Sequence, residues 1–174
     1  MGADMDPVAY FTTLARYDAW ATQRLLDAVA VLPDDDYRRD VGLFFKSIHG
    51  TLSHLLVGEV HLWQVRFAGG GSPRLALDAE LEPDRARLAE RLLEGIARWP
   101  QVIAGIAPER WDGNLDYSTS TGVPTSVPFA PTMAHVFNHG THHRGQITAA
   151  LTALGQPCPE IDLVYMLRQE KQPT

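Results

Sequence analysis

The sequence lacks the features that mark secreted and membrane-bound proteins. It has a single cysteine, Cys158, so no disulfide can form within the chain. Prolines on both sides of this cysteine predict a stiff loop, and we interpret its thiol as an ordinary loop thiol. No stretch approaches about 18 uninterrupted apolar residues, and the N-terminus has no basic segment followed by an apolar one. We therefore expect a cytoplasmic protein with no membrane partner.

Clustered positive charge is also missing. The chain has 15 Lys and Arg residues against 21 Asp and Glu, which gives a net charge of -6, and no run is rich in Lys or Arg. Because phosphate backbones are bound through clustered basic side chains, we expect no nucleic-acid partner. The 174 residues are 45% hydrophobic, which is enough apolar mass for one core. We predict one domain, residues 1–174.

Hydrophobic periodicity predicts three helical segments in the first two thirds of the chain. Asp6 and Pro7 suit the N-cap and the first position of the first helix. Pro100 is expected to kink or split the third. The predicted ranges are residues 7–32, 43–67 and 83–103.

The last third changes character twice. Residues 115–129 are rich in Ser, Thr and Val around Gly122, which predicts two short strands or an irregular hairpin. A long helix follows over residues 131–154, and a short one over 162–168. The predicted fold is therefore all-α, a four-helix bundle with a short β-hairpin-like insertion before the last long helix. Such bundles hold sites built from inward-facing side chains.

Four of the seven histidines lie within residues 135–146, HVFNHGTHHRGQ. At about 100° per residue, His143 falls inside the apolar stripe of this helix and His139 falls on its edge. His135 and His142 project further towards the polar side. His139 and His143 are four residues apart, so both can reach one ion. The stripe consists of Met133, Val136, Gly140, Ile147, Leu151 and Leu154.

A third imidazole is available in SIHGTLSHLLVGEVHLW, where His54 and His61 are seven residues apart and share a helix face, while His49 projects about 140° away. Three imidazoles from two helices suit Zn or Ni and leave coordination positions open, which favours chemistry over scaffolding. The alternative is that one histidine is a satisfied core residue and the others lie at the surface. The pattern alone does not choose between His54 and His61.

Four motifs in this order resemble the DinB family, also described as DinB/YfiT-like metalloenzymes, and the likeness covers essentially the whole chain. The motifs are YDAWATQRLL, SIHGTLSHLLVGEVHLW, NHGTHHRGQI and EIDLVYML. The resemblance implies a DinB/YfiT-type four-helix bundle, a homodimer and one divalent transition metal ion on three histidines. Carried over residue by residue, the metal ligands are His54, His139 and His143. Where family members often have Asn two residues after the Trp of helix one, this chain has Thr22.

The resemblance also implies an activity, because related members include thiol-dependent S-transferases and a mycothiol-dependent maleylpyruvate isomerase. We therefore expect a divalent-metal-dependent S-transferase or isomerase that conjugates or isomerises a small electrophile with the help of a low-molecular-weight thiol. A bound metal with open positions lowers the pKa of a thiol, which fits such chemistry. Two alternatives stay open: a metal-dependent hydrolase using a metal-bound water, and a non-catalytic metal-binding stress-response dimer.

Other residues have weaker claims. Arg144 and Gln146 flank the HxxxH pair and are candidates to bind an acidic ligand group or to orient a metal ligand. His61 and Arg144 are the candidate catalytic residues, with His61 as a general base. Glu59 and Asp18 are further acid/base candidates. Aromatic residues at helical spacing are assigned to the core by default. They are Tyr17, Trp20 and Trp63.

Overall fold

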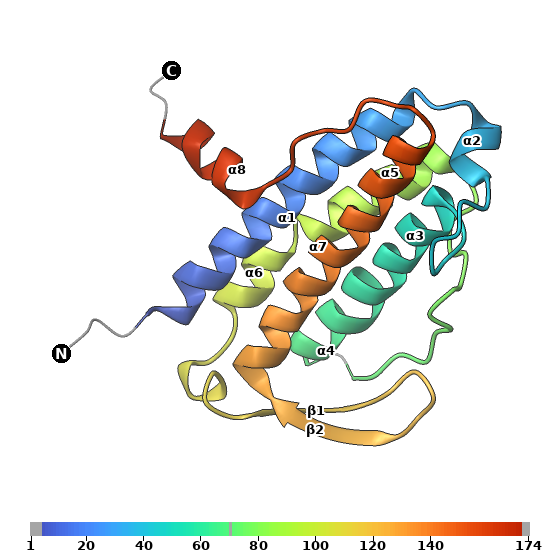
Figure 1. The fold of residues 1–174 in the computed structure, drawn as a ribbon. Coiled ribbons are helices and arrows are strands. Elements are labelled where there is room, and N and C mark those ends of the chain that lie inside the picture. Colours follow the sequence, from blue (N-terminus) through green and yellow to red (C-terminus); the bar gives the residue numbers. More distant parts are fainter. Residues whose placement is uncertain (1–4, 70, 172–174) are drawn as a thin grey trace.

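The computed structural model describes residues 5–69 and 71–171. Figure 1 shows long helical segments running alongside one another, with a β-hairpin beyond one end of the bundle and a short C-terminal helix against α1. In chain order the elements are α1 (Pro7–Ala30), α2 (Asp34–Arg38), α3 (Ile48–Leu55), the π-helix η1 (Leu56–Gln64), α4 (Val65–Phe67), α5 (Arg85–Ile96), α6 (Trp99–Ala104), the 3-10 helix η2 (Pro108–Arg110), β1 (Asn114–Ser118), β2 (Pro124–Pro128), α7 (Phe129–Ala153) and α8 (Leu163–Glu170).

The first and third predicted helices form with the expected signals. The Asp6 side chain accepts a hydrogen bond from the backbone N–H of Val8, and Pro7 occupies the first turn of α1. The third pattern is split as Pro100 predicts: α5 ends at Ile96, and α6 restarts with this proline in its first turn. Proline has no N–H to continue an existing helix but fits a first turn, so the break falls beside it.

The second predicted helix begins later than expected and is not α-helical throughout. Residues 43–47 form a tight turn in which Leu43 pairs with Lys46, and Lys46 has a φ of 68°. The helix then begins at Ile48, where the Ser47 hydroxyl accepts from the N–H of Gly50. After Leu55 the backbone widens into the π-helix η1. Long π-helical stretches are rare and are often found at functional sites.

The hairpin forms where the sequence predicts it, with β1 and β2 antiparallel and Leu115 paired with Val127. Helix α7 begins at Phe129, two residues before the predicted start. The acidic stretch after Pro33 forms the short helix α2. No helix in the described ranges is long and apolar enough to cross a bilayer.

The two larger buried clusters among the described residues hold the bundle together. One joins the second half of α1 to α3, α5 and the end of α7, with Leu52 fully buried in it. The other joins the first half of α1 to α6, β1 and the start of α7, around the fully buried Trp99. Burying such large apolar side chains contributes about 1.5–3 kcal/mol each. Because α3 packs directly on α7, histidines on the two helices can meet.

Candidate metal centre

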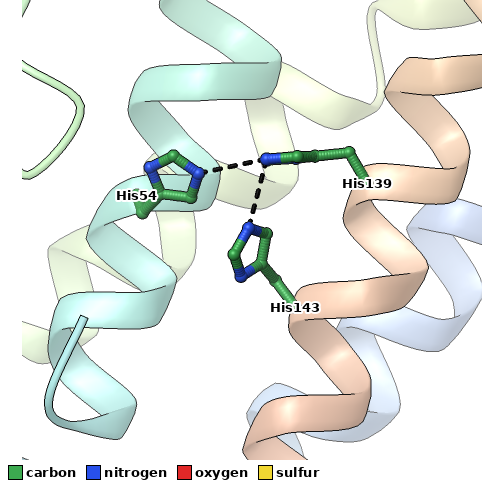
Figure 2. Close-up of side chains that lie close together, drawn as sticks. All are labelled: His54, His139 and His143. Atoms are coloured by element: carbon green, nitrogen blue, oxygen red, sulfur yellow. Dashed lines mark hydrogen bonds between the residues drawn. The ribbon is translucent and has the colours of Figure 1, made fainter. Parts of the chain in front are cut away.

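Figure 2 shows His54 of α3 facing His139 and His143 of α7, with their ring nitrogens turned towards one another. The Nε2 atom of His139 lies 3.2 Å from Nε2 of His54 and 3.1 Å from Nε2 of His143. The potential ligand atoms of all three lie within 4.8 Å of one another. His54 and His143 are buried and His139 is half-buried, so the cluster sits between helices rather than on the surface.

The protons of these rings show why the cluster fits a metal ion. Nδ1 of His54 donates to the Leu77 carbonyl at 2.7 Å, and Nδ1 of His143 donates to Gln146 Oε1 at 2.8 Å. Each neutral imidazole carries one proton, so both Nε2 atoms are left as acceptors. His139 has one proton to give and faces both of them. A cation satisfies all three lone pairs, and two nitrogens of a tetrahedral site with bonds of about 2.0–2.1 Å stand roughly 3.3 Å apart.

Burial keeps the three imidazoles neutral, which is the form that binds metal. Burial and then the neighbouring imidazoles lower the pKa of His139 from 6.5 to about 3. Burial lowers the pKa of His143 to about 4, although its bond to Gln146 opposes the shift. The pKa of His54 is also lowered by burial. At neutral pH the site therefore presents three uncharged nitrogen ligands.

Packing fixes the ring of His54. Phe45 stacks on it with the ring centroids 3.8 Å apart and the planes 17° from parallel. On the other side, a Cβ atom at Gly58 would stand 3.7 Å from Cε1 of His139 and 3.9 Å from Nε2 of His54. Glycine at this position leaves space beside the nitrogens that any larger side chain would start to fill.

A buried group of ionisable side chains packs around Gly140, on the face of α7 next to the histidines. The Arg144 guanidinium forms an ion pair with Asp18 of α1. Its Nη1 also donates a hydrogen bond to the hydroxyl oxygen of Thr22 at 3.3 Å. Glu59 of η1 is 1% exposed, and burial, followed by the Asp18 carboxylate, raises its pKa well above the usual value. A proton on Glu59 would leave this group with no net charge, which lowers the free-energy cost of burying it.

The remaining predicted residues are spread over different surroundings. His61 of η1 points towards α5, where its Nε2 lies 3.5 Å from Nη2 of Arg91, outside the histidine cluster. The wider π-helical turns separate it from the face of His54, with which it would align in a regular α-helix. Arg144 is directed into the bundle as described above. Gln146 orients His143, and His49 pairs with Glu80 at 2.6 Å.

A cavity of about 210 Å³ opens beside the cluster, and His54 and His139 form part of its wall. Trp63, assigned to the core from its spacing, packs against the core cluster around Trp99 and also lines this cavity. The exposed His135 lines it too. The other lining residues come from elements far apart in sequence, and no local pattern indicates them. They are Gly58, Leu62, Arg66, Leu77, Tyr117, Thr119 and Ser120.

The fold agrees with comparisons to known proteins. Protein DinB of Bacillus subtilis (strain 168) is 28% identical over 165 residues, which covers 91% of this chain and 95% of that protein. The structure of YfiT from Bacillus subtilis, described as a probable metal-dependent hydrolase with an unusual four-helix bundle topology, superimposes with a TM-score of 0.68. That likeness covers 90% of this chain and 93% of YfiT at 14% identity, and it shows the shared fold. The model of the DinB family matches residues 4–173, so the chain belongs to the DinB family.

Proposed function

We propose that this protein is a metal-dependent enzyme that binds one Zn or Ni ion on His54, His139 and His143 and acts on a small molecule in the adjoining cavity. The convergence of the three Nε2 atoms carries this proposal, because the single proton of His139 cannot satisfy both of its neighbours, whereas a cation can accept all three lone pairs. When bound, the ion supplies a Lewis acid that lowers the pKa of a group in an open coordination position.

The finer proposal is a thiol-dependent S-transferase or isomerase. All three candidate ligands are neutral, so the ion keeps its full positive charge for an anion such as a thiolate. A free thiol has a pKa of about 8.5, so a moderate shift gives the reactive thiolate at neutral pH. The described part of the cavity wall combines aromatic and hydroxyl side chains with one guanidinium and contains no carboxylate that would repel the thiolate.

A metal-dependent hydrolase is the second candidate. It is favoured by the description of YfiT and by His135, which reaches the same cavity and is 5.6 Å from His139 between ring centroids. In this reaction His135 would take a proton from the attacking water. Although His135 is exposed as a whole residue, partial desolvation of its ring lowers its pKa, which favours the basic form of the imidazole at neutral pH.

One experiment separates these activities. Zn- and Ni-loaded protein is assayed with 1-chloro-2,4-dinitrobenzene plus glutathione, bacillithiol or mycothiol, and separately with p-nitrophenyl acetate. A thiol-dependent rate that His143→Ala abolishes supports the transferase. Ester hydrolysis that His143→Ala and His135→Ala both reduce, without any response to thiols, supports the hydrolase. A loaded protein that does neither and binds no thiol in calorimetry favours a non-catalytic metal-binding module.

We also propose, from the family resemblance, that the protein is a homodimer. Light scattering coupled to size-exclusion chromatography gives its mass in solution, and a mass near 19.2 kDa would contradict the proposal.

A further inference from the structure

Arg66 occupies an unusual position for a charged side chain. It belongs to the short helix α4 and is only 7% exposed, yet it forms part of the wall of the cavity next to the histidines. Its Nη2 donates to the Ser118 carbonyl at 3.2 Å. Its Cζ lies 4.7 Å from the ring centroid of Trp63 and 4.5 Å from that of Tyr117. The guanidinium therefore rests in the corner between two aromatic rings.

The charge of Arg66 has no acidic partner among the residues that the structure describes. None of the ion pairs in that part of the chain includes it, and its buried Nε has no hydrogen-bond partner there. Arg144 is also buried, but it forms an ion pair with Asp18. A buried cation without an anion is costly, and cation–π contacts return about 0.5–2 kcal/mol. An anion beside the guanidinium would offset this cost.

The surroundings of Arg66 indicate what that anion is. Two hydroxyl side chains, Thr119 and Ser120, line the same cavity, and Arg66 is its one cationic side chain among the described lining residues, apart from histidines. A single guanidinium matches a carboxylate, whose two oxygens accept in parallel from its planar fork. The cavity volume of about 210 Å³ is below the roughly 300–1,000 Å³ of drug-sized sites. It therefore suits a small organic acid.

We propose that Arg66 binds a carboxylate of the small-molecule substrate, held between the Trp63 and Tyr117 rings while its reactive end faces His54 and His139. This proposal takes one point from the proposed function, namely that the substrate binds in this cavity. A purely structural role, in which Arg66 attaches the hairpin to α4 through Ser118, predicts no preference for anions and is the alternative that the experiment excludes.

The test measures binding to metal-free protein, so it does not depend on the identity of the metal or on activity. Benzoate and benzamide, and phenylacetate and phenylacetamide, are titrated at constant ionic strength while side-chain guanidinium signals are followed by 1H–15N NMR. Each pair has the same shape and differs in charge. We expect each acid to bind at least about tenfold more tightly than its amide and to shift the Nε–H signal that Arg66→Gln removes.

Arg24 provides a matched control, because its Cζ lies 5.1 Å from the Trp20 ring centroid and its Nε donates to the Glu160 carbonyl, away from this cavity. Arg66→Gln should abolish the preference for the acids, and Arg24→Gln should keep it. Equal binding of acids and amides to the wild type overturns the proposal even if Arg66→Gln does not fold. Tighter, Arg66-dependent binding of phenyl phosphate overturns the choice of carboxylate. Metal content, measured on separate samples, reports on the proposed function independently.

Discussion

Oε1 of Glu59 on η1 occupies the space that a Cβ atom on Gly140 of α7 would need. The same absent Cβ would stand 3.1 Å from Nη1 of Arg144 and from Oδ1 of Asp18. Glycine at position 140 therefore lets α1, η1 and α7 bring three ionisable side chains together at one point. Because His139 is the preceding residue, this contact also sets how closely α7 approaches η1 beside the histidines.

Replacing Gly140 with alanine should therefore destabilise the protein. Overpacking of a tight interior costs about 1–3 kcal/mol, which outweighs the gain of up to about 1 kcal/mol from alanine in a helix. Gly145 is the matched control: it lies in the same helix, is exposed, and a Cβ there meets nothing within 4 Å. Urea unfolding should show a loss for Gly140→Ala and no loss, or a small gain, for Gly145→Ala. Equal effects would contradict the close contact.

The protonated state of Glu59 can be tested through the pH dependence of stability. Burial and the Asp18 carboxylate raise the pKa of Glu59 in the folded protein, whereas the unfolded chain has the usual value near 4.5. Between these values the folded state binds the extra proton, so this residue makes the free energy of unfolding fall as pH rises above about 4.5. Glutamine has a similar shape and cannot ionise.

Glu59→Gln should consequently become more stable relative to the wild type as the pH increases from 5 to 8. Urea unfolding at both pH values measures the difference. A difference that does not change over this range would mean that Glu59 is already ionised. Asp18→Asn serves as the contrasting variant, because it leaves the guanidinium of Arg144 buried without its anion and should destabilise by about 3–5 kcal/mol.

In the metal-free protein, the histidine cluster should make the free energy of unfolding rise with pH in the acid range, which is opposite to the effect of Glu59. In the folded state burial lowers the pKa of His139 to about 3 and that of His143 to about 4. The unfolded chain takes up these protons near pH 6.5, so the free energy of unfolding falls as the pH decreases from about 6.5 towards 4. His139→Ala should have a shallower slope over pH 6.5–4 in urea unfolding. An unchanged slope would show that the histidine protons are not responsible.

Much of the site follows from the sequence, because it depends on helical spacing. The apolar stripe of α7 predicts that His143 lies inside it, His139 at its edge, and His135 and His142 towards the polar side. In the structure His143 is buried, His139 is half-buried, and the other two are exposed. The HxxxH spacing predicts that two imidazoles face one point. The helix break at Pro100 and the hairpin follow from equally local rules.

The parts that the sequence does not predict depend on contacts between distant segments. A π-helix has no hydrophobic signature of its own, so the position of His61 could not be derived from α-helical angles. The carbonyl of Leu77 and the ring of Phe45 reach His54 from irregular loops. Arg66 is likewise placed in the cavity by the meeting of α4 with β1.

The three proposed ligands should be individually necessary for metal. Plasma mass spectrometry on protein purified without a His tag should find about one equivalent of Zn or Ni in the wild type. His54→Ala, His139→Ala and His143→Ala should each lose it, while circular dichroism confirms that the helices persist. His142→Ala is the control, since His142 is exposed and lies next to a proposed ligand without belonging to the cluster. Loss of metal in this control would contradict the assignment.

Gln146 should tune the site without being a ligand. Its Oε1 accepts from Nδ1 of His143, which fixes the tautomer that leaves Nε2 free for the metal. Removing such a partner usually lowers metal affinity about 10–100-fold, so Gln146→Ala should weaken Zn binding by this factor in a competition titration with a chromophoric chelator. His142→Ala removes the other side-chain contact of Gln146, between Nε2 atoms 3.2 Å apart, and leaves the bond to His143 in place. If both variants weakened Zn binding equally, orientation of His143 would not be the cause.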